Sequence, residues 1–139
     1  MSATQKFNAF TEDVGRGVHN LNADTLKVML SNVPPVATNA VFADLTDISS
    51  GHGYTAAGTA AGSNAFTQTA GVAKLTASSV TFTASGGTIG PFQFAVLYND
   101  TAGSKNLICW WDFGVPVTLA DGQSFTVAFN AGTGIITLT

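Results

Sequence analysis

The sequence contains few charged residues. Only 9% of its 139 residues are Asp, Glu, Lys or Arg, whereas ordinary soluble proteins carry about 25%. A soluble monomer usually keeps charges of both signs dispersed over its surface. Replacement of charge by Ala, Thr, Ser and Gly is typical of a protein whose surface is covered by copies of itself or by partners. The alternative is a monomeric β-domain of unusual composition, because charge bears on association rather than on fold.

Basic residues are scarce and scattered. The net charge is −3, and the sequence has five basic residues, namely Lys6, Arg16, Lys27, Lys74 and Lys105. Proteins that bind nucleic acid present clustered Lys and Arg side chains to the phosphates. We therefore expect no nucleic-acid partner.

Long apolar runs and a second cysteine are also missing. The longest apolar runs, near residues 94–98 and 107–111, fall far short of the roughly 20 residues that span a bilayer, so we expect no membrane partner. The first ten residues show no basic-then-apolar leader pattern, which favours a cytoplasmic origin. Cys109 is the single cysteine, so no internal disulfide can form, and its apolar neighbours predict a buried thiol.

Titratable residues are too few and too dispersed to predict a catalytic or metal site. His19 and His52 are the two histidines, and neither has a partner at metal-ligand spacing. The run Ser-Gly-His at 50–52 offers adjacency, which does not make a catalytic triad. Asp44 and Asp47 are interpreted as ligands of turn backbone groups rather than of calcium. We predict no enzymatic activity, no cofactor and no metal.

The first 22 residues differ from the rest. Phe7, Phe10, Val14, Val18 and Leu21 are three or four residues apart, which places them on one side of a helix. Gly15 and Gly17 interrupt the pattern, so we expect a helix over about residues 4–14. Residues 1–22 are predicted to be an N-terminal helix or arm, and 23–139 a β-sandwich domain. The helix either caps the sandwich or packs on a neighbouring subunit.

From residue 24 the apolar period changes to two. Leu26, Val28 and Leu30 face one way, and Lys27 and Met29 face the other. Turn signals divide the chain into about eight strands, a spacing typical of an all-β, antiparallel two-sheet β-sandwich or jelly roll. The expected strands cover residues 24–32, 41–48, 65–69, 74–83, 90–100, 107–113, 125–129 and 135–138.

Two strand patterns carry finer predictions. Phe92, Phe94, Val96 and Tyr98 alternate, so we expect them on one face of their strand. The last two strands are separated by a glycine turn at 132–134, which predicts a terminal hairpin.

Three features are candidates for contact with other molecules. The loop at 49–64 is rich in Gly, Ala, Ser and Thr and contains Tyr54, and long loops in compact domains are usually functional or bound. Trp110 and Trp111 are adjacent on a strand, so one is predicted to enter the core and the other to lie near the surface or an interface. The N-terminal aromatic residues could pack on a neighbour. The candidate interface residues are therefore Phe7, Phe10, Val14, Tyr54, Trp110 and Trp111.

The order of these segments resembles a class of small bacteriophage virion proteins. The likeness rests on DTLKVMLSNVPP, GHGYTAAG, IGPFQFAVLYND, LICWWDFG and LADGQSFTVAFNAGTGIITL, which cover most of the chain beyond residue 23. Proteins of this class are capsid decoration (cement) proteins or tail-fibre proteins. The resemblance implies a β-sandwich that assembles on a phage particle without a catalytic role, and it supplies no active-site residue.

The sequence therefore favours a capsid decoration protein that docks on the phage major capsid protein and stabilises the DNA-filled head. We expect a homo-oligomer, with a trimer preferred because quasi-threefold positions on a shell are natural docking points. Its location would be the virion surface after assembly in the host cytoplasm. The alternatives are a tail-fibre or host-recognition module that binds carbohydrate, and a cell-wall hydrolase.

Overall fold

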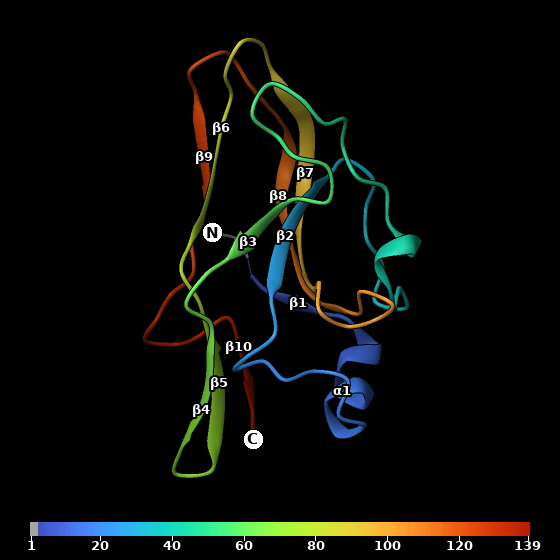
Figure 1. The fold of residues 1–139 in the computed structure, drawn as a ribbon, viewed down its shortest axis with the longest axis vertical. Helices are drawn as coiled ribbons and strands as arrows, with labels where there is room; N and C mark the ends of the chain where they lie inside the picture. The colour runs from blue at the N-terminus through green and yellow to red at the C-terminus, as the bar shows by residue number, and fades with distance from the viewer. Residues whose placement is uncertain (1–2) are drawn as a thin grey trace.

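The structure is a computed structural model that describes residues 3–139, and it confirms an all-β chain of antiparallel sheets (Figure 1). No helix in this range is long and apolar enough to cross a membrane. The elements in chain order are β1 (Gln5–Lys6), α1 (Asn8–Gly15), β2 (Leu26–Ser31), the 3-10 helix η1 (Phe42–Asp44), β3 (Thr59–Ala61), β4 (Ala65–Thr69), β5 (Val72–Thr76), β6 (Val80–Thr83), β7 (Ile89–Asn99), β8 (Leu107–Leu119), β9 (Ser124–Val127) and β10 (Ile136–Leu138).

The largest sheet has five strands in the order β1-β8-β7-β2-β3. Strands β7 and β8 are its long central pair, and β2 pairs along half of β7, from Leu26 opposite Asn99 to Ser31 opposite Phe94. The predicted alternation in β2 is confirmed. Leu26, Val28 and Leu30 belong to the main core, whereas Met29 belongs to a second core on the opposite face of the sheet.

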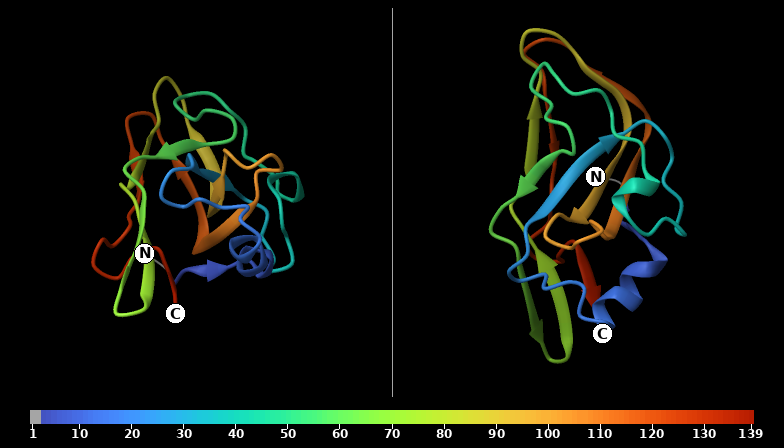
Figure 2. Two further views of the ribbon diagram at one scale, coloured as in Figure 1. Left: turned by 60° about the horizontal axis from the view of Figure 1, so that its bottom comes forward. Right: turned by 45° about the vertical axis from the view of Figure 1, so that its right-hand side comes forward.

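The other strands form two smaller sheets, β10-β5-β4 and β6-β9. Both lie along the same side of the five-stranded sheet, while η1 and α1 lie toward the other side (Figures 1 and 2). The main core fills the space between the sheets. Its members include Leu75, Phe82 and Val127 from the smaller sheets and Leu97 and Trp111 from the large one. The hydrogen-bonded strands thus form three sheets, rather than the two that the sequence predicts.

Two predicted strands are corrected by local polar contacts. Residues 41–48 do not form a strand, because the Asp44 carboxylate accepts the backbone N–H groups of Ala40 (2.9 Å) and Val41 (3.2 Å) and turns the chain into η1. The strand predicted at 74–83 is two strands in different sheets, β5 and β6. Between them, the Ser78 N–H donates to the Gly62 carbonyl and the Ser79 hydroxyl accepts from Phe129 N–H. These contacts hold residues 77–79, where the chain passes from the sheet of β5 to the sheet of β6.

The predicted C-terminal hairpin is wrong. Strand β9 pairs with β6, from Ser124 opposite Thr83 to Val127 opposite Val80. Strand β10 pairs with β5, and Ile136 lies opposite Leu75. The turn at 130–134 therefore carries the chain from one small sheet to the other, and each final strand finds its partner far back in the sequence.

The predicted single face of β7 is also wrong. Phe92 packs in the main core with Ala95 and Leu97, whereas Val96 and Tyr98 pack in the second core. The register against β8 shifts between Phe92 and Phe94. Between these two pairs β7 advances from Phe92 to Phe94 while β8 runs from Val117 back to Asp112, so the ladder is irregular here and the simple alternation of faces does not continue across it.

The N-terminal segment is built into the body of the protein. Gln5 and Lys6 pair with Trp110 and Cys109 at the edge of the large sheet, and α1 begins later than predicted, at Asn8. Phe10 and Leu21 belong to the main core. Residues 1 and 2 of the predicted arm lie outside the described residues.

Candidate functional site

Three of the candidate interface residues lie in the N-terminal segment, and two of these are buried in their own chain. Phe7 is fully buried, and its ring lies 4.5 Å from that of Trp110. Phe10 is 4% exposed and packs in the main core. Strand β1 pairs with the edge of β8, and the segment that follows it turns both rings into the interior. Neither ring therefore presents surface to a partner in this fold. Val14 is half-buried beside the core, and its contact with a partner stays a prediction.

The two tryptophans lie on opposite faces of β8, as the alternation predicts. Trp111 is 2% exposed and belongs to the main core, and its indole N–H donates to the Thr4 hydroxyl at 2.9 Å. Trp110 is half-buried and covers the second core next to Phe7. Trp110 is therefore the tryptophan that retains surface for contact with another molecule.

Tyr54 is buried, and it ties the loop at 49–64 to the large sheet. Its hydroxyl donates to the Asp47 carboxylate and accepts from the Leu30 backbone N–H at 3.0 Å. The other carboxylate oxygen of Asp47 accepts from Ala57 N–H at 2.6 Å, and the Tyr98 hydroxyl donates to the Ala57 carbonyl. Burial, together with the Asp47 hydrogen bond, raises the pKa of Tyr54 far above its usual value. These contacts form a clamp that keeps the phenol protonated.

The clamp gives a stability prediction. Tyr54→Phe is expected to lower the free energy of unfolding by about 1–3 kcal/mol, because it leaves the Leu30 N–H and the Asp47 carboxylate without their buried partner. Urea unfolding measures this loss. Tyr98→Phe is the comparison within the clamp: it removes a hydroxyl that makes one hydrogen bond, to the Ala57 carbonyl, so its loss should be smaller than that of Tyr54→Phe. A Tyr54→Phe protein as stable as the wild type would contradict the clamp.

The residues considered for chemistry are dispersed in the structure. His52 is exposed in the loop, whereas His19 is half-buried under α1. Asp44 caps η1, and its two backbone hydrogen bonds lower the pKa of its carboxyl. Asp44 and Asp47 thus bind turn and loop backbone, as predicted. Within residues 3–139, no three His, Cys, Asp or Glu side chains gather in a way that could hold a metal ion.

Cys109 is fully buried in the main core, as predicted. Desolvation raises the pKa of its thiol well above the usual value. The thiol is therefore held in the neutral form, which is a poor nucleophile.

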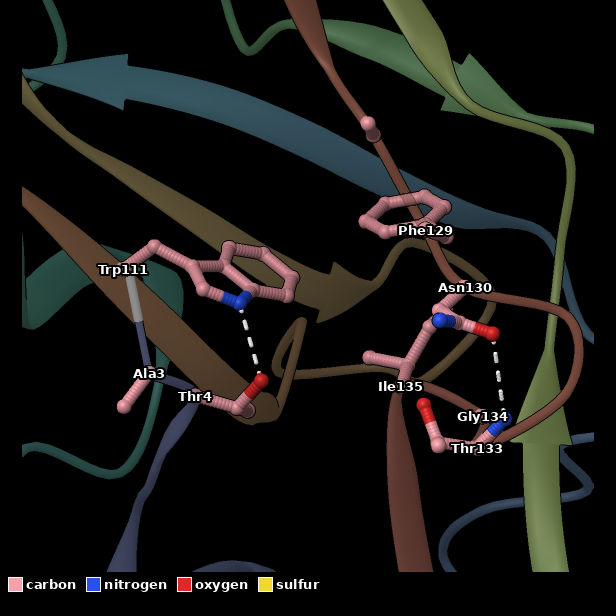
Figure 3. A pocket seen from close by; sticks show the side chains of 9 residues that line it. Ala3, Thr4, Trp111, Phe129, Asn130, Thr133, Gly134 and Ile135 are labelled. Atoms are coloured by element: carbon pink, nitrogen blue, oxygen red, sulfur yellow. Dashed lines mark hydrogen bonds between the residues drawn. The ribbon is translucent and has the colours of Figure 1, made fainter. Parts of the chain in front are cut away.

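A cavity of about 320 Å³ lies between the start of the chain and the turn at 130–134 (Figure 3). Its wall includes Trp111, Phe129 and Ile135, and the Trp111 and Phe129 rings are 5.6 Å apart. Polar groups of Asn130 at its wall bind the backbone of the turn. The Asn130 side-chain oxygen accepts from Gly132 N–H, and the Asn130 carbonyl accepts from Gly134 N–H. Local sequence patterns do not predict this cavity, because its walls come from segments far apart in the chain, near residues 3–4, 111 and 128–135.

A polar cluster beneath α1 was also missed. It joins Asp13 and His19 of the N-terminal segment to Asp24, Asn99 and Asn106. The pairs that make contact are 75 to 93 residues apart, so no local motif marks them.

Comparison with known proteins adds no relative: no family model, no curated protein and no solved structure matches this chain.

Proposed function

We propose that this protein is a structural component of a phage virion, a capsid decoration protein that docks on the major capsid protein as a homo-oligomer, with a trimer preferred. In this proposal the two smaller sheets act as one layer of a sandwich against the five-stranded sheet, and the protein stabilises the head without any catalytic step. The resemblance of the strand segments to small virion proteins is one source of support.

The observation that carries the proposal is the surface of the β4–β5 hairpin, which extends along one side of the molecule (Figure 1). Thr67, Thr69 and Val72 are exposed on it, and the side chain of Val72 is 42% exposed. The hairpin has one charged side chain, Lys74, whose ammonium group donates to the carbonyls of Ala131 and Gly132. An uncharged, projecting surface loses little solvation when it is buried against another protein.

The rest of the surface is consistent with several such contacts. Among residues 3–139, the exposed large apolar side chains are Val33, Val36, Val72, Val115 and Leu138. Val33 and Val36 lie in the connection after β2, and Val115 lies on β8. Leu138 on β10 lies opposite Ala73, next to Val72. Several weak contacts in one oligomer add up to strong retention on a lattice.

The proposal predicts that heads lacking this protein lose DNA at a lower temperature than complete heads, and that added purified protein restores them. DNA release during heating measures the effect. Heads that are equally robust, combined with virions that fail to adsorb to cells, would instead support the tail-fibre alternative.

A pair of variants tests the hairpin itself. Val72→Asp is expected to weaken binding to heads by at least about tenfold, which corresponds to about 1.4 kcal/mol per binding site. Val36→Asp is the matched control, because Val36 is similarly exposed, at 52%, but lies outside the hairpin. Equal binding by both variants, measured by co-sedimentation with heads, would exclude the hairpin as the contact.

A further inference from the structure

The polar cluster beneath α1 contains a histidine with an unusual environment. The ring of His19 packs against Phe10, with centroids 5.4 Å apart, and its Nδ1 lies 3.0 Å from the side-chain nitrogen of Asn99. Its Nε2 is buried and has no hydrogen-bond partner among the described residues. A buried polar atom without a partner costs free energy and calls for an explanation.

The orientation of the Asn99 amide is fixed by its surroundings. Asn99 is fully buried, and its side-chain oxygen accepts from the N–H groups of Thr101 (3.0 Å) and Ala102 (3.2 Å). Its side-chain nitrogen donates to the Asp24 carboxylate at 2.7 Å. Rotation of the amide would break all three hydrogen bonds, so the NH₂ group must face His19.

This orientation determines the protonation state of His19. Because Asn99 presents a donor, the Nδ1 of His19 must be an acceptor, and the proton of the neutral ring must sit on Nε2. A proton added to Nδ1 would point at the Asn99 NH₂ group and break the His19–Asn99 hydrogen bond. The cluster therefore accommodates neutral imidazole and excludes imidazolium in the same geometry.

We propose that His19 is an acid-sensitive latch: in its neutral Nε2–H form it holds the first half of the connection between α1 and β2, residues 16–20, against the end of β7, and protonation opens this half. Residues 21–25 are held independently, because Leu21 is buried in the main core and the Asn64 side chain donates to the carbonyls of Leu21 and Asp24. The inference does not depend on the proposed function. It concerns the connection alone, because β1 is also held by its strand pairing with β8 and by the buried Phe7.

The charges around His19 set the direction of the effect. Asp13 on α1 and Asp24 in the connection both favour the charged ring, and the amides of Asn99 and Asn106 on the β7–β8 side are neutral. Burial opposes the charge more strongly, so the pKa of His19 lies below the ordinary value of 6.5. The unfolded or opened state then binds more protons than the closed state. The contribution of the latch is complete above pH 6.5 and is lost as the pH falls below it.

The tautomer can be tested directly. In long-range ¹H–¹⁵N spectra at neutral pH, we expect His19 to be the Nε2–H tautomer, and the exposed His52 provides a comparison in the same spectrum. An Nδ1–H tautomer for His19, or an imidazolium at neutral pH, would overturn the proposal.

Opening can be followed by hydrogen exchange. After correction for intrinsic rates, protection of the amides in residues 16–20 should fall between about pH 6.5 and pH 5, by at most about tenfold per pH unit because one proton is taken up. Amides of β7 and β8 should keep their protection. Unchanged protection in residues 16–20 would contradict the latch.

A matched pair of variants separates His19 from other acid effects. His19→Asn keeps an acceptor near the position of Nδ1 but does not titrate, so its residues 16–20 should stay protected in acid. His52→Asn should open like the wild type. Acid opening that persists in His19→Asn would assign the effect to another group. If His19→Asn does not fold, the tautomer and exchange measurements on the wild type still decide the question.

Discussion

Replacing Trp111 by alanine is expected to lower the free energy of unfolding by about 3–5 kcal/mol, the range for truncation of a core aromatic side chain. The indole is 2% exposed and packs in the main core. Its N–H also binds the Thr4 hydroxyl at 2.9 Å, so the truncation removes both packing and a tie to the N-terminal segment. Denaturant unfolding measures the loss, provided the variant remains folded in water.

The neighbouring residue supplies the control. Trp110→Ala removes the same group from the other face of β8, where the ring is only half-buried. Its stability cost should be clearly smaller, and any loss of association should be larger than for Trp111→Ala. Equal costs for the two variants would contradict the assignment of one tryptophan to the core and the other to the surface.

Gly58→Ala is expected to be of similar severity, with a loss of about 2–5 kcal/mol or failure to fold. A Cβ at Gly58 would lie 2.0 Å from the Val28 carbonyl oxygen and 2.6 Å from its carbon, both in the backbone of β2. Gly58 also has a φ of +91°, which side-chain-bearing residues rarely adopt. Strand β2 cannot move aside without losing its pairing with β7. The loop that contains residue 58 would therefore have to move away from β2.

Gly62→Ala is the matched control from the same loop. A Cβ at Gly62 meets no atom within 4 Å, and its φ is not positive. Its thermal unfolding should stay close to that of the wild type. If Gly58→Ala were equally harmless, the close approach of the loop to β2 would be wrong.

The sequence predicted those parts of the fold that depend on local pattern. Strict alternation in β2 and the adjacent tryptophans in β8 correctly indicated opposite faces, because a strand without interruption reverses its side chains at every residue. The pattern failed in β7, where the pairing with β8 is irregular between Phe92 and Phe94 and the later residues Val96 and Tyr98 pack in the second core. Nothing in the alternation of Phe92 to Tyr98 marks that irregularity.

Pairing over long distances was not predictable in the same way. The glycine turn at 132–134 is a normal hairpin signal, but β10 finds a better partner in β5, about 60 residues earlier. For the same reason Tyr54 was assigned to a contact surface. Its role depends on Leu30 and Asp47, which only the folded chain brings together.

The pairing of β10 with β5 has a consequence for synthesis of the protein. Residues 72–76 leave the ribosome long before residues 136–138, so one side of β5 stays unpaired until β10 has also emerged. An unpaired strand edge is a template for association with another chain. Ribosome-stalled chains that end before residue 135 should therefore aggregate or recruit chaperones, whereas chains that extend past residue 138 by the length of the exit tunnel should not.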